Sequence, residues 1–522
     1  MNKKRKILPI ILKAVSRIFS VSVVLAAIIL FQSLAGMDVL PQKYNIAVVL
    51  VMIVLIGLAI ALQFHRKTRA ISAVLLIVFT LVFITGNYYL LRSSDTLEKM
   101  TASETSTDVI TLYVLKTDSA SKLTEISGGK IGILKTLDRK NTDAALKAAS
   151  HKTDEKLTIQ EYENSDQLVN ALIDKKVQAI LLNSAYLSLV TEAEDGSSAA
   201  DEVKSVWTYE IERKLEIQDQ KTDNSAKEDT EKTEAKSDNT KKDSTESKDS
   251  TESKDSSKDD TTAKKTTKSI TDSPFVLYVS GNDSEGELKA NGRSDVNMLI
   301  AVNPQTGKIL LVNTPRDYYV NLPGIGELDK LTHAGIYGVD ESMKTLAELY
   351  GIPIQYYVKL NFTGFEEIID ALGGVTVESD VDFTVANWHY VVGENDLSGI
   401  EALAFARERY SFTTGDRQRG KNQQAVIRGV VKKVCSPAIL TNYLDLLHAA
   451  EGTVETNMAM KDITALVKYQ LDKGINWDIE SISADGTGDQ KYCYSAGGSG
   501  YVMMPDQASV DVVKAKLNEI LN

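Results

Sequence analysis

The sequence predicts an α/β protein: a mixed central sheet with helices on both faces, preceded by three transmembrane helices and a small α/β accessory domain. Three features lead to this prediction. The first 92 residues contain three long apolar runs, and residues 271–522 alternate between strand-like and helix-like patterns. A charged, polar stretch at 218–270 separates that alternating region from a shorter one at 93–217.

Length and composition limit the possible functions. A chain of 522 residues is too long for a single core and predicts two or three domains plus additional segments. With a formal net charge of −12, the chain lacks the basic surface that nucleic-acid binding requires, which argues against nucleic acid as the main partner. The five histidines show no metal-ligand spacing, which disfavours a zinc enzyme. For Cys435 and Cys493, a disulfide and two buried free thiols remain alternatives.

The three apolar runs, at 18–35, 46–64 and 70–91, are each close to the ~20 residues needed to cross a bilayer. Basic residues lie before the first run and between the second and third, whereas the loop between the first two has only Lys43, offset by Asp38. The positive-inside rule therefore predicts a multi-pass cell-membrane protein with a cytoplasmic N-terminus, and with everything after residue 92 outside the cell.

The sequence pattern of residues 93–217 predicts a small extracellular α/β domain without a recognisable set of catalytic residues. Strands are expected at 109–115, 130–134 and 177–182, and helices at 143–150 and 165–175. The following stretch, 218–269, contains no Leu, Ile, Val, Met or aromatic residue, so it has nothing to bury and is expected to be a disordered tether. An arm that binds an anionic polymer or the wall is the alternative.

Residues 271–522 predict the main domain, in which strands and helices alternate. The expected strands are 275–279, 298–302, 309–312, 356–360 and 375–377. The expected helices are 341–350, 364–371, 423–434, 438–450, 461–471 and 507–521.

Charged residues gather at the ends of the expected strands. Asp283 follows the first strand and Asp295 precedes the second, and such a pair of carboxylates is suited to a hard divalent cation. Arg316 ends the third strand on the same rim. Further on, residues 406–424 concentrate basic side chains whose guanidinium forks suit a multiply charged anion: Arg407, Arg409, Arg417, Arg419 and Lys421. A solvated basic face is the structural alternative for this cluster.

These residues belong to an ordered series of motifs. The series is Asp283, Arg293-Ser294-Asp295, Thr314-Pro315-Arg316-Asp317, Asp329-Lys330-Leu331-Thr332-His333-Ala334, Asn361-Phe362-Thr363-Gly364-Phe365, Asp370-Ala371-Leu372-Gly373-Gly374-Val375, Ala406-Arg407-Glu408-Arg409 and Gly415 to Gln424. In this order and type of motif the chain resembles the LytR-CpsA-Psr family, strongly over 275–434 and more loosely to the end. The three spans and the accessory module resemble the three-span, capsule-type branch.

The resemblance implies an enzyme of a Gram-positive-type envelope. Its implied activity is a phosphotransferase-type transfer of a glycopolymer (teichoic acid, capsule or another wall polysaccharide) from an undecaprenyl-pyrophosphate carrier to peptidoglycan. It implies Mg²⁺ or Mn²⁺ on Asp283 and Asp295. The implied catalytic set is Arg316, Arg407, Arg409, Arg419, Gln423 and Asp416. The implied substrate-binding set is Lys330, Asp317, Arg417 and an apolar lining for the lipid: Phe365, Ile369, Val426 and Val430. For each of these apolar residues, a simple hydrophobic core is the alternative.

Three questions stay open at the level of sequence. The general base is Asp416, Asp317 or Asp283. Two positions depart from the family pattern, Val296 where a hydroxyl is usual and Asn422 where a further arginine is common. Two other functions compete with the transferase, namely a phosphatase acting on a lipid pyrophosphate and a non-catalytic envelope regulator or wall-binding module.

Overall fold

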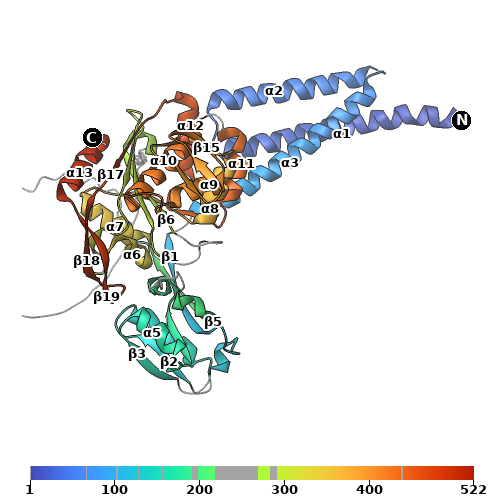
Figure 1. Cartoon of the computed structure of the whole chain (residues 1–522). Helices are drawn as coiled ribbons and strands as arrows, with labels where there is room; N and C mark the ends of the chain where they lie inside the picture. The colour runs from blue at the N-terminus through green and yellow to red at the C-terminus, as the bar shows by residue number, and fades with distance from the viewer. Residues whose placement is uncertain are drawn as a thin grey trace, which may run out of the picture. The chain divides into compact units, whose positions relative to one another are not determined.

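The computed structural model describes residues 2–65, 67–101, 104–126, 129–153, 157–190, 198–217, 269–282, 288, 291–436 and 439–522. The tether expected at 218–270 lies outside the described residues up to 268, and so does Asp283. Figure 1 shows the course of the chain through its helices and strands.

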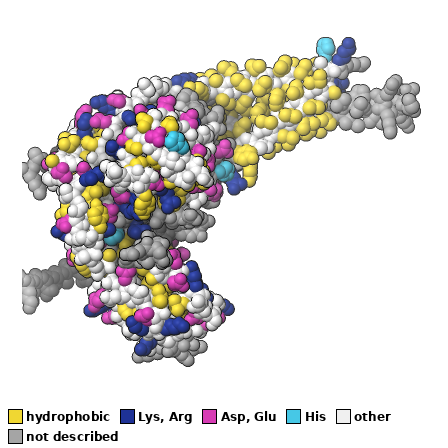
Figure 2. Space-filling model, viewed as in Figure 1, with side chains coloured by type: hydrophobic (Ala, Val, Ile, Leu, Met, Phe, Trp, Pro, Cys, Tyr) yellow, Lys and Arg dark blue, Asp and Glu magenta, His cyan; other side chains and the backbone are white. Residues whose placement is uncertain are grey.

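The N-terminal region consists of three long helices, α1 (Asn2–Gly36), α2 (Gln42–Ala61) and α3 (Arg69–Thr101). Their apolar windows of 24, 23 and 24 residues are long enough to cross a membrane. Figure 2 shows hydrophobic side chains covering the visible surface of these helices. Some polar side chains in this region are hydrogen-bonded within the bundle, namely Ser72 Oγ to Ala59 O at 2.7 Å and Ser33 Oγ to Asn87 Oδ1 at 2.6 Å. These features are those of a membrane anchor.

The accessory region forms one mixed five-stranded sheet in the order β3-β2-β4-β1-β5. Its strands are β1 (Thr105–Leu115), β2 (Lys130–Leu134), β3 (Thr158–Tyr162), β4 (Ala179–Asn183) and β5 (Val203–Lys214), with helices α4 (Arg139–Ser150) and α5 (Ser165–Ile173). Sequence patterns identify β1, β2 and β4, whose apolar residues are buried, but miss β3 and β5. Those two edge strands alternate exposed polar residues along most of their length, so no apolar run marks them.

The main domain is built on a mixed six-stranded sheet in the order β16-β11-β6-β7-β8-β17. Its strands are β6 (Phe275–Gly281), β7 (Val296–Asn303), β8 (Lys308–Asn313), β11 (Tyr356–Leu360), β16 (Val454–Thr456) and β17 (Asp478–Ser483). Strand β6 is parallel to β11 and antiparallel to β7, while β8 is antiparallel to β7 and parallel to β17. The ends of β6, β8 and β11 therefore meet the beginning of β7 at one edge of the sheet.

Helices cover both faces of this sheet, as predicted. One face, with Tyr278 and Leu310, packs against α7 (Val339–Tyr350) and α13 (Gln507–Leu521). The other face, with Met298 and Leu311, packs against α10 (Asp416–Val434) and α12 (Met460–Lys473). The remaining helices of the domain are α6 (Leu331–Ala334), α8 (Phe362–Ala371), α9 (Gly399–Arg407) and α11 (Ile439–Ala450).

Four hairpins lie outside the central sheet in the described part of the domain. They pair β9 (Tyr319–Leu322) with β10 (Glu327–Lys330), β12 (Val375–Ser379) with β15 (Gly393–Leu397), β13 (Phe383–Val385) with β14 (Trp388–Tyr390), and β18 (Gly486–Cys493) with β19 (Gly498–Pro505). The prediction of 375–377 as a strand is confirmed, but it belongs to a hairpin instead of the main sheet. Residues of β12 alternate between buried and exposed, whereas a central strand is buried on both faces.

Helix α10 begins at Asp416, seven residues before the predicted start at 423. Gly415, with φ of 50°, precedes it in a backbone conformation that other residues rarely adopt. The polar sequence of the first two turns, which contains three of the basic residues singled out above, hid this part of the helix. Because these turns are helical, the directions of their basic side chains are fixed by the helix.

Candidate active site

A cavity of about 630 Å³ opens at the edge of the sheet where β6, β8 and β11 end and β7 begins. We call it the basic pocket. Its basic lining residues are Arg293, Arg316, Lys330, Arg407, Arg409 and Arg419, and its carboxylates are Asp166 and Asp295. Basic groups thus outnumber acidic ones in the described lining, although the whole chain is acidic. Such a pocket attracts an anion.

An ion pair between Arg316 and Asp295 lies at the centre of the pocket. Arg316 Nη1 donates to Asp295 Oδ1 at 2.6 Å, and Thr332 Oγ1 donates to the same oxygen at 3.3 Å. Burial raises the pKa of Asp295, but the guanidinium groups of Arg316 and Arg293 more than offset it, so the pKa is lowered overall. Asp295 is therefore ionised.

Further ion pairs hold Arg316 from the opposite side. Its Nε lies 3.8 Å from Asp317 Oδ2 and 3.8 Å from Asp416 Oδ2. Arg419 Nη2 donates to Asp416 Oδ2 at 2.9 Å, and Lys330 Nζ lies 3.2 Å from Asp317 Oδ1. Among the residues that the structure describes, the buried Nε of Arg316 has no hydrogen-bond acceptor. A buried donor without a partner is rare, and an anionic ligand oxygen would satisfy it.

The helical direction of α10 separates the basic residues of its first turns. Arg419 and Gln423, four residues apart on one face, line the basic pocket. Arg417 points elsewhere: its Nε donates to Asp485 Oδ1 at 2.7 Å and its Nη2 to Gly486 O at 2.7 Å. Arg417 and Asp416 line a smaller neighbouring cavity of about 150 Å³, which Arg316 and Arg419 share. Of the predicted substrate-binding groups, Arg417 therefore does not join the basic pocket.

Arg407 and Arg409 enter the pocket from the end of α9 and the residues after it. The Arg407 guanidinium lies 4.2 Å from the centre of the Phe362 ring, a cation–π distance. Arg409 Nη2 donates to Tyr410 Oη at 2.5 Å. The stacking on Phe362 places a cation directly above an aromatic surface, so the charged and apolar parts of the pocket adjoin.

One wall of the pocket is apolar. It is formed by residues of β6, β7, β11, α8, α9 and α10: Val279, Val296, Leu360, Phe362, Phe365, Leu403 and Ile427. The prediction that Phe365 faces a cavity agrees with this position. Three others take the alternative position in a hydrophobic core: Ile369 and Val426 are buried in a cluster with Val375 and Val377 of β12, and Val430 packs against it. Neighbouring residues on a helix point about 100° apart, so Val426 and Ile427 face different surroundings, which an apolar pattern alone does not resolve.

Of the two carboxylates predicted to bind a metal ion, Asp295 lies among the described residues and Asp283 lies outside them. Among the described residues, no group of three or more His, Cys, Asp or Glu side chains is arranged to hold a metal. Mg²⁺ needs only one or two carboxylates, because water and substrate phosphates complete its coordination. The ionised Asp295, whose Oδ1 is engaged by Arg316, fits that requirement in its chemistry.

The hydrogen bonds that support the side chains of the basic pocket were not predicted from the sequence. His333, which lines the basic pocket, makes a 2.6 Å hydrogen bond through Nδ1 to Asp329 Oδ1, and Asp329 Oδ2 accepts from Ser495 N at 2.7 Å. Burial raises the pKa of Asp329, but its hydrogen bonds and the His333 charge lower it overall. The motif around His333 signals this residue, but nothing in the sequence indicates the contact with Ser495.

Both cysteines are free thiols. Cys435 is partly buried and Cys493 is buried beside the basic pocket. Burial raises the pKa of each to about 11, which makes them poor nucleophiles at neutral pH. The structure thus has two free thiols, of which only Cys493 is buried, instead of a disulfide.

Comparison with known proteins identifies what the chain is similar to. A sequence model described as the LytR_cpsA_psr family matches residues 230–519. The polyisoprenyl-teichoic acid–peptidoglycan teichoic acid transferase TagU of Bacillus anthracis is 37% identical over 250 residues, which cover 48% of this chain and 79% of that protein. The protein of the same name from Enterococcus faecalis is 33% identical over 204 residues, covering 38% and 67%. The crystal structure of B. subtilis TagU is 28% identical, with a TM-score of 0.39 and coverage of 48% and 97%.

Proposed function

Because the chain belongs to the LytR_cpsA_psr family, we propose that it is a membrane-anchored phosphotransferase that attaches a polyprenyl-pyrophosphate-linked glycopolymer to peptidoglycan. The observation that carries this proposal is the basic pocket, in which guanidinium groups adjoin an apolar wall. A carrier lipid with a diphosphate head group needs both surfaces next to each other. The names of the relatives, which are teichoic acid transferases, support a wall glycopolymer as substrate.

The expected location follows from the same chemistry. Three apolar helices anchor the chain, and the distribution of basic residues favours a cytoplasmic N-terminus with the basic pocket outside the cell. An anchored enzyme stays at the membrane surface, where the diphosphate of a lipid carrier lies. The envelope is then of the Gram-positive type, with peptidoglycan and its polymers outside the membrane.

The proposed reaction joins the acceptor to the phosphorus atom that carries the polymer. A peptidoglycan hydroxyl oxygen forms a bond to this phosphorus, and the bond from the phosphorus to the bridging oxygen breaks. The bridging oxygen keeps the electron pair and leaves as part of the polyprenyl monophosphate. Negative charge grows on the transferred phosphoryl and leaving oxygens, and preorganised Arg316, Arg407 and Arg419 stabilise it.

The hydroxyl proton requires an acceptor near Arg316. Of the described candidates, Asp416 lines the smaller cavity beside Arg316 and Arg419, whereas Asp317 lines neither cavity. Asp416 is therefore the better-placed general base. Its ion pair with Arg419 also fixes the direction of the carboxylate.

In the central test, the full-length protein in detergent is incubated with a carrier-linked polymer and with peptidoglycan, and the covalent product is measured. We expect a covalent polymer–peptidoglycan product whose yield rises with acceptor concentration. Release of free polymer phosphate at a rate independent of acceptor would instead identify a lipid pyrophosphate phosphatase. Binding of the carrier without either product would identify a non-catalytic envelope protein.

A divalent cation, Mg²⁺ or Mn²⁺, is proposed on Asp295 together with Asp283, where it would neutralise charge on the diphosphate. We expect chelation to abolish transfer and added Mg²⁺ to restore it. Asp295→Asn should raise the Mg²⁺ concentration for half-maximal activity by roughly tenfold or more, because it removes a ligand charge. Asp489→Asn, which changes a surface carboxylate paired with Lys491, is the control. Unchanged activity in chelator would contradict the metal site.

A further inference from the structure

Two segments of the accessory domain line the basic pocket. Asn164 and Asp166 come from the start of α5, and residues 188–190 form the end of the short 3₁₀ helix after β4 (Ser184–Leu189) and the residue that caps it. We call this set the accessory wall. It lies outside residues 230–519, which match the family. The pocket of this chain is therefore completed by residues that the family domain does not supply.

The turn between β18 and β19 fixes the accessory wall against the main domain. Asn164 Nδ2 donates to Gly497 O at 3.4 Å, and a Cβ on Gly497 would lie 2.8 Å from that of Asn164. On the same turn, Ser495 Oγ and Tyr337 Oη share a 2.9 Å hydrogen bond. The Tyr337 ring meets that of Tyr186, from the accessory domain, edge-on at 6.3 Å. Close packing of this kind leaves little freedom for the wall to move.

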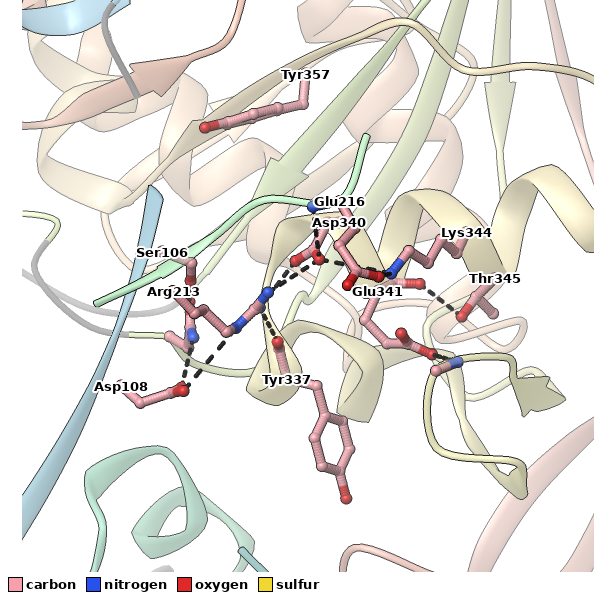
Figure 3. Close-up of polar contacts among 12 residues, drawn as sticks. Ser106, Asp108, Arg213, Glu216, Tyr337, Asp340, Glu341, Lys344, Thr345 and Tyr357 are labelled. Atoms are coloured by element: carbon pink, nitrogen blue, oxygen red, sulfur yellow. Dashed lines mark hydrogen bonds and ion pairs between the residues drawn. The ribbon is translucent and has the colours of Figure 1, made fainter. Parts of the chain in front are cut away.

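A second set of contacts holds the two domains together. Figure 3 shows Arg213, from β5, with its guanidinium directed at Asp340 of α7. Its two terminal nitrogens lie 2.9 and 2.8 Å from the two Asp340 oxygens, and one of them also donates to Tyr337 O. Asp108 Oδ2 lies 3.9 Å from Arg213 Nε and completes the cluster. Such a bidentate pair fixes orientation as well as distance.

Contacts between residues connect the surfaces that line the pocket. The apolar wall meets Arg407 at Phe362, and Arg316 leads through Asp317 to Lys330, with distances of 3.8 and 3.2 Å. Beyond Lys330 lie the buried Asp329 and the turn that contacts Asn164. A chain of contacts thus runs from Arg316 through Asp317, Lys330 and this turn to the accessory wall. In a carrier-linked polymer the first sugar is attached directly to the diphosphate, so it comes next to any other surface that lines the same pocket.

The chemistry of the accessory wall suits a sugar. Asp166 brings a carboxylate, which accepts hydrogen bonds from sugar hydroxyls. Asn164 and Ser188 already bond Gly497 O, Gln167 N and Ala185 O, but an amide and a hydroxyl each keep further hydrogen-bonding capacity. Leu189 and Val190 add apolar surface for the C–H face of a ring. The Asp166 carboxylate would repel a second phosphate, and this polar surface does not suit a lipid chain.

Resting on the proposed function, we infer that the accessory wall is a sugar subsite that binds the first sugar units attached to the carrier diphosphate. The accessory domain then helps to determine which polymer is transferred. Asp166 is a specificity-determining residue in this arrangement, while Arg213 and Gly497 position the wall.

The test compares two probes on full-length protein in detergent: geranylgeranyl diphosphate, and the same lipid diphosphate bearing an N-acetylglucosamine or a glucose unit. We expect wild type to bind at least one sugar-bearing probe more tightly than the bare one. Asp166→Ala should weaken binding of that probe about ten- to hundredfold, the effect of one lost hydrogen bond to a charged group, and leave bare diphosphate unchanged. Asp166→Asn, which keeps the hydrogen-bonding capacity, should recover part of the loss.

Asp174→Ala is the matched control, because that carboxylate of the same domain pairs with Lys176 on the surface and does not line the described pocket. If Asp166→Ala weakened binding of both kinds of probe equally, Asp166 would have a structural role and the sugar subsite would be overturned. If the variant weakened binding of neither kind of probe, the subsite would also be overturned. Weakened binding of a soluble peptidoglycan fragment alone would place the acceptor there and also overturn it. If wild type bound no lipid diphosphate at all, the proposed function itself would fail.

Discussion

Replacing Arg316 with alanine is expected to lower the transfer rate by about 10²–10³-fold, the loss found when one preorganised charge-stabilising group is removed from an active site. Arg316 links Asp295, Asp317 and Asp416, so its removal also leaves these carboxylates without their shared cation. Arg316→Lys should recover only a small part of the rate, because an ammonium cannot bridge several oxygens in one plane. The measurement is initial-rate transfer onto peptidoglycan.

The matched control is Lys432→Ala, which removes an exposed cation from the last turn of α10. It should leave the rate unchanged, which shows that total charge is not the cause. Thermal unfolding of both variants separates lost chemistry from lost fold. Full activity of a folded Arg316→Ala protein would contradict the assignment of the basic pocket as the active site.

Much of the fold was predictable because its central strands are buried on both faces. Residues 298–302 form a continuous apolar run of the kind that such a strand requires, and β7 contains them. Strand β17 was not predictable, because its side chains are mostly exposed and only its pairing with β8 defines it. Helix α10 was placed too late, because its first two turns are almost entirely polar and a glycine with positive φ sets its start.

Some residues of the candidate site could likewise be predicted from the sequence, and others could not. Arg407 and Arg419 could be identified because clustered guanidinium groups are unusual in an acidic chain, and Arg316 because it follows a predicted strand at the same rim. The structure gathers all three in one pocket. Arg417 and Arg419 could not be told apart, since their directions depend on where α10 begins. The contribution of Asp166 was beyond sequence reasoning, because only domain packing brings it to that pocket.

Replacing Arg213 with methionine is expected to destabilise the full-length protein by about 2–3 kcal/mol. Breaking a buried ion pair by removing one partner costs about 3–5 kcal/mol, and we reduce this figure because the Arg213 side chain is 30% exposed. Asp340, at 3% exposure, would remain buried with Lys344 Nζ at 3.8 Å and the Glu216 backbone amide at 3.4 Å from its Oδ2. Thermal unfolding and hydrogen exchange of β1 and β5 measure the effect.

The pH dependence of this effect has a definite sign. Burial raises the pKa of Asp340, but Arg213 more than offsets it, so the folded pKa lies below the unfolded one. This pair therefore stabilises the protein above the unfolded pKa of about 4, and the stabilisation is lost as pH falls through the folded pKa. In Arg213→Met burial is no longer offset by Arg213, so the variant should lose less stability on acidification than wild type. Arg139→Met, which breaks only exposed pairs with Asp143 and Glu161, should cost less than about 1 kcal/mol. An Arg213→Met protein as stable as this control at pH 7 would show that the ion pair does not hold the accessory domain in place.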